Sequence, residues 1–142
     1  VHALGAFYLC SALAPVIRQS SRGSIVLISS TTAARPSPGG APYMMGKVAL
    51  EALGQTLALE EQQHGTRVNI VAPGLVATDM GDRLAKAVTG AENAAALDAE
   101  FPFGRVTRPA DVANLVSFLM SEQAELITGQ RIEVHAGRPG VR

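Results

Sequence analysis

The stretch Gly23-Ser24-Ile25-Val26-Leu27-Ile28-Ser29-Ser30 decides the fold. Its centre is an unbroken apolar run in which three of the four residues are β-branched. Such a run, without alternating polar residues, is typical of a strand that is covered on both faces, as in a parallel sheet. We therefore predict a strand over residues 24–29, with two serines at its carboxyl end.

Helices and strands alternate on either side of this run. Prolines and glycines punctuate the sequence, and the apolar spacing between them changes from helical to extended. The predicted order is a helix over residues 1–19, the strand over 24–29, a loop over 31–42, a helix over 43–64, a strand over 67–72, helical pieces over 75–103, a helix from Pro109 and a strand over 131–135. This alternation predicts an α/β fold with parallel strands and helices on both faces. Ligands of such sheets bind beyond the carboxyl ends of the strands, here Ser29-Ser30 and Ala72-Pro73-Gly74.

Composition limits the possible functions. The 142 residues fit one domain, and 47% hydrophobic residues with a mean hydropathy of +0.20 exclude wholesale disorder. Twelve basic and twelve acidic residues give zero net charge, without the basic excess of a nucleic-acid-binding protein. The single cysteine, Cys10, forms no internal disulfide and is too few for a cysteine-based metal site. We therefore expect no nucleic-acid partner, no metal and a reducing, cytoplasmic compartment.

The apolar segment over residues 1–17 has to be weighed as a signal peptide or a membrane span. No basic region precedes it, Pro15 interrupts it, and it is shorter than the 18 or more residues expected of a span. We predict a buried helix instead, and no membrane partner. Because the sequence opens on Val1 rather than Met, we also expect a fragment or a processed product.

Tyr43 and Lys47 are four residues apart on a predicted helix and therefore share a face. An ammonium group near a phenol favours the phenolate and lowers the pKa of a tyrosine from about 10. A tyrosine tuned in this way can act as a general acid or base. The spacing is common, however, and by itself it more often marks an ordinary pair on a helix surface.

The predicted strand ends add candidate groups to this pair. Ser30 precedes Tyr43 by 13 residues, and the Pro/Gly loop between them is long enough to bring the hydroxyl beside the phenol. There it could hydrogen-bond a substrate carbonyl or carbinol, although a polar strand end is the simpler interpretation. After the next strand, Pro73-Gly74 leaves the backbone groups of residues 75 and 76 available to a planar amide, and Thr78 adds a hydroxyl.

The sequence resembles the carboxyl-terminal half of a short-chain dehydrogenase/reductase, from the single-domain branch of that family. The similar segments are Gly23–Ser30, Tyr43-Met44-Met45-Gly46-Lys47, Asn69-Ile70-Val71-Ala72-Pro73-Gly74 with Thr78-Asp79-Met80, Gly104-Arg105 with Pro109-Ala110-Asp111-Val112-Ala113, and Ile127-Thr128-Gly129-Gln130. They cover nearly all of the sequence in the family's order and spacing. The resemblance implies a partial, Rossmann-like, doubly wound parallel sheet, of which residues 1–142 hold three carboxyl-terminal strands with their flanking helices.

The resemblance also implies an oxidoreductase that interconverts an alcohol and a carbonyl with NAD or NADP. Ser30 would orient and polarise the substrate oxygen, and Tyr43 would give or take the hydroxyl proton. Lys47 would lower the pKa of Tyr43 and hold the nicotinamide ribose. The turn from Pro73 to Val76, together with Thr78, would grip the carboxamide. The implied cofactor-binding residues are Tyr43, Lys47, Pro73, Gly74, Leu75, Val76 and Thr78.

Two positions depart from the family's pattern. Where the family usually has an asparagine that completes the catalytic set through a water, this sequence has His2, 28 residues before Ser30. A histidine can also relay a proton, so His2 is a further candidate catalytic residue. His135-Ala136-Gly137 stands where the family more often has an acidic residue and two glycines. That end often serves subunit contact, and we interpret it as structural.

The amino-terminal half of such a domain is not represented. The sequence has no glycine-rich phosphate loop after a first strand, because Gly39-Gly40 lies between the serine strand and the tyrosine helix. We therefore expect this chain alone to bind the cofactor poorly, and the full-length protein to be a homodimer or homotetramer that acts on a small molecule. The alternative is a non-catalytic scaffold or binding module of the same fold. A serine hydrolase is excluded because the sequence has no Gly-x-Ser-x-Gly elbow.

Overall fold

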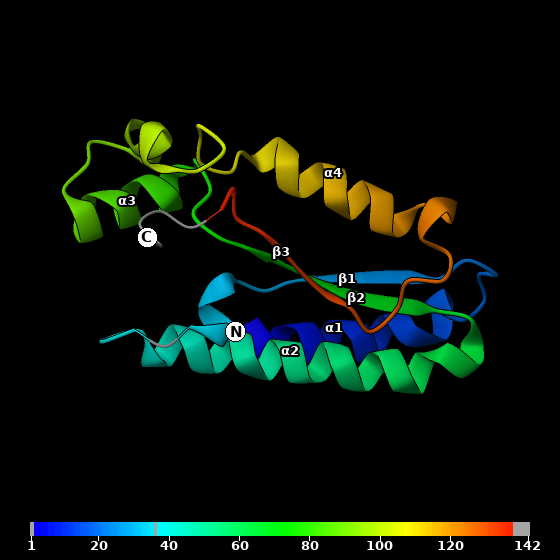
Figure 1. The fold of residues 1–142 in the computed structure, drawn as a ribbon. Coiled ribbons are helices and arrows are strands. Elements are labelled where there is room, and N and C mark those ends of the chain that lie inside the picture. Colours follow the sequence, from blue (N-terminus) through cyan, green and yellow to red (C-terminus); the bar gives the residue numbers. More distant parts are fainter. Residues whose placement is uncertain (1, 36, 138–142) are drawn as a thin grey trace.

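The sheet has three parallel strands in the computed structural model, which describes residues 2–35 and 37–137 (Figure 1). The strands are β1 (Ser24–Ile28), β2 (Arg67–Pro73) and β3 (Arg131–Val134), in the spatial order β1-β2-β3. β2 pairs with β1 on one side, where Leu27 lies opposite Ile70, and with β3 on the other. The predicted α/β fold with a partial, Rossmann-like parallel sheet is therefore confirmed.

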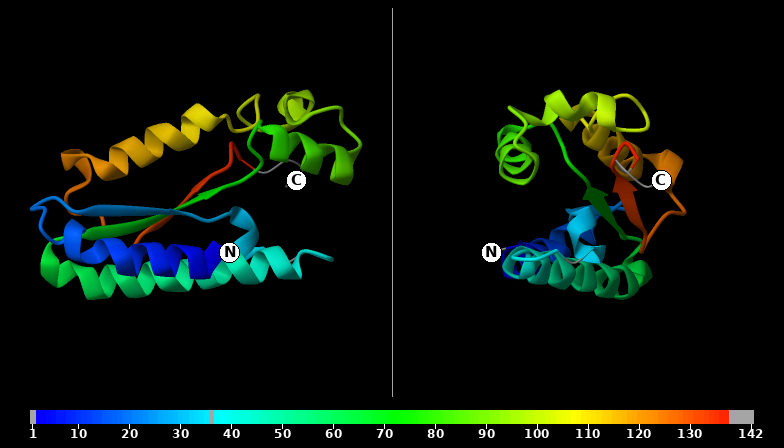
Figure 2. Two further views of the ribbon diagram at one scale, coloured as in Figure 1. Left: turned by 180° about the vertical axis from the view of Figure 1, so that it is seen from behind. Right: turned by 60° about the vertical axis from the view of Figure 1, so that its left-hand side comes forward.

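Helices cover both faces of this sheet, as crossover connections between parallel strands require. α1 (His2–Ile17) and α2 (Ala41–Glu61) lie side by side on one face, and α4 (Pro109–Met120) lies on the other (Figures 1 and 2). α3 (Asp79–Thr89) lies beyond the carboxyl end of β2. The carboxyl ends of the strands thus lie at the same end of the molecule as the amino-terminal ends of α1 and α2.

The core is centred on β2, the middle strand. Ile70 packs against α2 and Val71 against α4, and both side chains are at most 1% exposed. Gly54 lets α2 approach the sheet closely, since a Cβ atom there would lie 2.9 Å from Ile70 Cδ1 and 3.0 Å from Leu27 Cδ1. Packing within the chain therefore accounts for the small and apolar residues along this face of α2.

α1 differs from its prediction as a buried helix. Cys10 is buried, but many of its apolar side chains project into solvent. The exposed large ones are Leu4, Phe7, Tyr8, Leu9, Leu13 and Val16. The prediction was wrong because α1 is apolar nearly all round, and the described residues cover only the side that faces α2 and the sheet. Pro15 does not end the helix, which continues to Ile17, whereas Val1 lies outside the described residues.

Among the described residues, no helix is both long and apolar enough to cross a bilayer.

The segments predicted as irregular contain short helices. The loop after β1 begins with a 3-10 turn, η1 (Thr31–Ala34), and α2 begins at Ala41, two residues before its predicted start. Pro42 suits this first turn because a helix start needs no backbone donor there. The predicted helical pieces over 75–103 are α3 and a 3-10 segment, η3 (Ala94–Glu100). The remaining 3-10 turns are η2 (Gln62–His64) and η4 (Glu122–Ala124).

Asn69 explains how β3 joins the sheet. Its side chain is fully buried on β2 and donates a hydrogen bond of 2.8 Å to the carbonyl oxygen of Ile127. Its Oδ1 accepts a bond of 3.1 Å from the backbone N–H of Gln130. Thr128 Oγ1 accepts a further bond of 3.1 Å from the N–H of Val68. These contacts satisfy buried polar groups and set the turn that leads into β3.

Candidate active site

Lys47 is held at the carboxyl end of β1. The residue is 8% exposed, and its ammonium donates a hydrogen bond of 3.0 Å to the carbonyl oxygen of Ile28, the last residue of the strand. Burial lowers the pKa of this ammonium, because a charged group loses solvation there. Its Nζ lies 5.6 Å from the centroid of the Tyr43 ring, within the range of a cation–π contact. Side chains four residues apart on α2 therefore meet.

Tyr43 lies in the first turn of α2, where its side chain is accessible. It is 38% exposed, and the ring of His2 packs edge-to-face against it, with centroids 5.6 Å apart and planes at 83°. His2 also fits against Gly46, where a Cβ atom would come within 3.3 Å of the imidazole Cδ2. The amino-terminal ends of α1 and α2 thus meet through His2 and Tyr43.

Ser30 follows β1 by two residues and is buried. Its Oγ caps η1 by accepting a hydrogen bond of 3.2 Å from the backbone N–H of Thr32, and it lies 3.2 Å from Thr32 Oγ1. Ser30 and Lys47 are therefore both attached to the end of the same strand, Lys47 through the carbonyl of Ile28.

The turn after β2 lies against the end of β3. The N–H of Gly74 donates a bond of 2.9 Å to the carbonyl of Val134, and a Cβ atom on Gly74 would lie 2.7 Å from the Cβ of His135. No larger residue fits this approach without a shift. Within residues 2–35 and 37–137, the N–H groups of Leu75 and Val76 donate to no partner.

Thr78 has a role that the sequence analysis did not assign. Its Oγ1 accepts a hydrogen bond of 3.2 Å from the N–H of Gly81 and so caps the amino-terminal end of α3. The same hydroxyl lies 3.4 Å from the carbonyl oxygen of Val76. The signal was present, because threonine before an acidic first turn is typical of a helix start.

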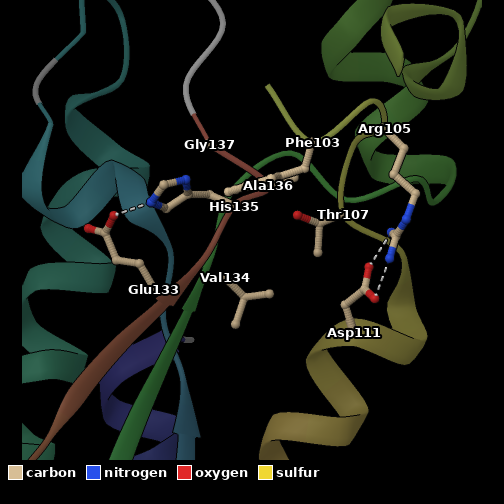
Figure 3. Close-up of a pocket in the computed structure, with 9 residues that line it drawn as sticks. All are labelled: Phe103, Arg105, Thr107, Asp111, Glu133, Val134, His135, Ala136 and Gly137. Carbon is tan, nitrogen blue, oxygen red and sulfur yellow. Dashed lines mark hydrogen bonds and ion pairs between the residues drawn. The ribbon is translucent and has the colours of Figure 1, made fainter. Parts of the chain in front are cut away.

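A cavity of about 490 Å³ lies between β3 and the start of α4 (Figure 3). Arg105 and Asp111 pair across its rim through hydrogen bonds of 2.6 and 2.8 Å, and His135 Nε2 lies 3.2 Å from Glu133 Oε2. The lining residues are Phe103, Arg105, Thr107, Asp111, Glu133, Val134, His135, Ala136 and Gly137. None of the predicted catalytic or cofactor-binding residues lines it, so this cavity and the Tyr43–Lys47 pair are different features of the same end of the fold.

Among the described residues, Tyr43 contacts both His2 and Lys47. Ser30 and the turn at Gly74 follow the neighbouring strands β1 and β2, and within the same residues neither hydrogen-bonds to Tyr43 or Lys47. A cluster around Arg131, which also includes Glu51 and Glu133, was not predicted from the sequence. One signal could have pointed to it: Glu51 lies four residues after Lys47 on the same helix.

This fold, with a buried lysine beside a tyrosine ring beyond the strand ends, is that of a partial Rossmann-like domain. The family model described as enoyl-(acyl carrier protein) reductase matches residues 1–138. Human dehydrogenase/reductase SDR family member 4 is 37% identical over 131 residues, which are 92% of this chain and 46% of that protein. The chain belongs to the short-chain dehydrogenase/reductase family.

Other similar proteins agree with this family. The 3-oxoacyl-(acyl-carrier-protein) reductase FabG of Rickettsia felis is 39% identical over 119 residues, which are 84% of this chain and 47% of that protein. The solved structure of ligand-free aldohexose dehydrogenase from Thermoplasma acidophilum is 28% identical with a TM-score of 0.88, over 100% of this chain and 59% of that one. This chain spans about half the length of the curated relatives it matches.

Proposed function

We propose that this chain carries the catalytic residues of an NAD(P)-dependent oxidoreductase that interconverts an alcohol and a carbonyl in a small molecule. The observation that carries the proposal is the setting of Lys47, a buried ammonium tied to the end of β1 and lying over the ring of Tyr43. The ammonium and the phenol are thus held together at the strand ends, where a tyrosine can exchange a proton with a bound small molecule. An ordinary surface lysine would be solvated instead.

Each side chain has a distinct part in this proposal. During reduction, Tyr43 donates its hydroxyl proton to the substrate oxygen, and during oxidation it takes the proton back. Ser30 orients and polarises the same oxygen with a hydrogen bond. Its hydroxyl hydrogen can turn from Thr32 Oγ1 towards the substrate while its oxygen still accepts the N–H of Thr32.

The residues at the strand ends fit a nicotinamide cofactor, NAD or NADP, which supplies or accepts the hydride when bound. Lys47 uses one N–H bond on Ile28 and retains two for the hydroxyls of a ribose. The N–H groups of Leu75 and Val76, which have no partner among the described residues, suit the oxygen of a carboxamide. The turn over residues 73–78 would hold that amide and so decide which face of the ring meets the substrate.

His2 is proposed to stand in for the family's asparagine as a proton relay, and its contact with the ring of Tyr43 supports this role. An imidazole titrates between pH 5 and 8, whereas asparagine does not. In the complete domain, we therefore expect His2→Asn to change the pH–rate profile. His64→Asn is the matched control, because His64 is exposed on η2 at the other end of α2. An unchanged profile for His2→Asn would remove His2 from the mechanism.

We also propose that residues 1–142 are the carboxyl-terminal half of one cytoplasmic domain. Among the described residues, β1 pairs only with β2, so its other edge is available to strands of an amino-terminal half that would hold the dinucleotide phosphates. The exposed apolar side chains of α1 suit contact with a second copy, which would give a homodimer or homotetramer.

The proposed activity is tested with the complete domain, meaning this chain joined to its amino-terminal half. We expect an activated ketone to drive the oxidation of NADH or NADPH. Calorimetry on the 142-residue chain alone should detect little binding of either cofactor. Stoichiometric binding by the chain alone would contradict the proposed division of the site. Cofactor binding by the complete domain without any turnover would instead favour a non-catalytic scaffold.

A further inference from the structure

A cluster of polar side chains joins three elements beside the candidate site. On α2, Glu51 Oε1 accepts hydrogen bonds of 2.6 Å from Ser29 Oγ and 2.8 Å from Arg131 Nε. The same guanidinium donates to Glu133 Oε1 at 2.7 Å and to the carbonyl oxygen of Ser30 at 3.2 Å. One planar side chain on β3 therefore contacts α2, its own strand and the residues that follow β1.

The members of this cluster are largely shielded from solvent. The side chains of Arg131, Glu51 and Glu133 are 19%, 14% and 21% exposed. Ions in such a setting are screened less than surface pairs, and a guanidinium holds several acceptors in one plane as an ammonium does not. Glu133 has a second cation in Arg35, whose guanidinium lies 2.5 Å away, so this carboxylate keeps a partner when Arg131 is removed.

The cluster contacts Ser30 through its backbone carbonyl rather than through its side chain. The direction of the Ser30 side chain depends on its extended backbone, with φ −158° and ψ 151°. Arg131 holds the carbonyl of this residue, and Glu51 holds the hydroxyl of its neighbour Ser29. Glu51 lies one helical turn after Lys47 on α2. The helix that carries the lysine is thereby attached to the residues that carry the serine.

We propose that Arg131 is a positioning residue for the Ser30 hydroxyl. Through the Ser30 carbonyl and through Glu51, it fixes where that hydroxyl lies relative to α2. Arg131 itself contacts neither Tyr43 nor Lys47 among the interactions of the described residues. The catalytic consequence rests on the proposed function, whereas the placement of Ser30 stands on these contacts alone, and the two are tested separately.

Placement is tested without catalysis, by amide hydrogen exchange on the complete domain. The N–H of Thr32 donates to Ser30 Oγ, so its protection reports the orientation of that side chain. We expect Arg131→Met to raise the exchange rate of this amide by about tenfold, as expected for one lost hydrogen bond. Unchanged exchange at Thr32 would overturn the inference.

Arg67→Met is the matched control. Arg67 is also a partly buried arginine on a strand, and it donates to the carbonyl oxygens of Leu119 and Ser121 at 2.6 and 3.3 Å, at the other end of the sheet. This variant should lower stability and leave the exchange of Thr32 at the wild-type rate. Equal acceleration at Thr32 in both variants would mean a general loosening of the fold and would also overturn the inference.

Kinetics test the catalytic consequence. We expect Arg131→Met to lower kcat by about tenfold while the dissociation constant of the cofactor changes by less than about twofold. In a Ser30→Ala background it should have no further effect, because both changes act through one hydroxyl. Effects that multiply would show that Arg131 does not act through Ser30. If Ser30→Ala alone leaves kcat unchanged, the proposed role of Ser30 fails, and the exchange result alone decides whether Arg131 positions it.

Discussion

Replacing Tyr43 by phenylalanine in the complete domain is expected to lower kcat by about 10²–10⁴-fold, the usual contribution of a positioned acid or base. The substitution removes the hydroxyl that would exchange a proton with the substrate. The ring itself remains, and both His2 and Lys47 contact the ring. The variant should therefore fold as the wild type does, and steady-state kinetics would show the loss chiefly in kcat.

The chain offers a matched control for this experiment. Its second tyrosine, Tyr8, is 66% exposed on α1, away from the ends of the strands. Tyr8→Phe makes the same chemical change and should leave kcat within about twofold of wild type, since it keeps the ring and removes a hydroxyl far from the strand ends. Near-normal turnover of Tyr43→Phe would show that the acid or base has been assigned to the wrong residue.

Replacing Gly81 by alanine is expected to destabilise the fold by about 3 kcal/mol or more, at the upper end of the cost of overpacking. Gly81 is buried in the first turn of α3, where an added Cβ atom would overlap the carbonyl group of Val76. The obstacle is backbone, which cannot swing aside as the end of a side chain can. The turn before α3 would have to move, and the cap that Thr78 forms on Gly81 would weaken. Urea unfolding of the two proteins measures this difference.

Gly5→Ala is the control for the same change elsewhere. Gly5 lies inside α1, and no atom lies within 4 Å of the position that its Cβ would take. Alanine should stabilise this helix by about 0.5–1 kcal/mol, because glycine loses more conformational freedom there. The two substitutions are thus expected to act in opposite directions. Equal unfolding midpoints for Gly81→Ala and the wild type would contradict the close approach of α3 to residue 76.

Much of the fold follows from local patterns in the sequence. The unbroken apolar run of β1, the spacing along α2 and the stop at Pro73-Gly74 predict elements whose bounds agree with the structure to within a few residues. The burial of α1 could not be predicted in the same way. The apolar side chains of a helix show which surface favours burial. Which neighbours cover that surface depends on the rest of the fold, and one side of α1 has no covering neighbour among the described residues.

The candidate site also contains some contacts that the sequence predicts and others that it does not. The contact between Tyr43 and Lys47 follows from helical periodicity, because residues four apart lie on one face. The contact between Glu51 and Arg131 joins positions that are 80 residues apart and lie in different elements. The spacing of residues along the sequence does not predict a contact of this kind. The acceptor for Lys47 is equally invisible in the sequence, since a backbone carbonyl belongs to every residue type. Contacts between residues that are close in the sequence can therefore be predicted from it, whereas the contacts that hold these residues in place depend on tertiary structure.

The attachment of Lys47 to a peptide oxygen has a consequence for how this protein tolerates change. Any amino acid at position 28 supplies the same acceptor, so that side chain, which is 43% exposed, is free to diverge without releasing the lysine. An insertion or deletion within β1 is not tolerated in the same way. It would place the carbonyl of another residue beside Lys47, and it would also shift the position of Ser30. At position 28, evolution is therefore constrained by the length of β1 rather than by the identity of the side chain.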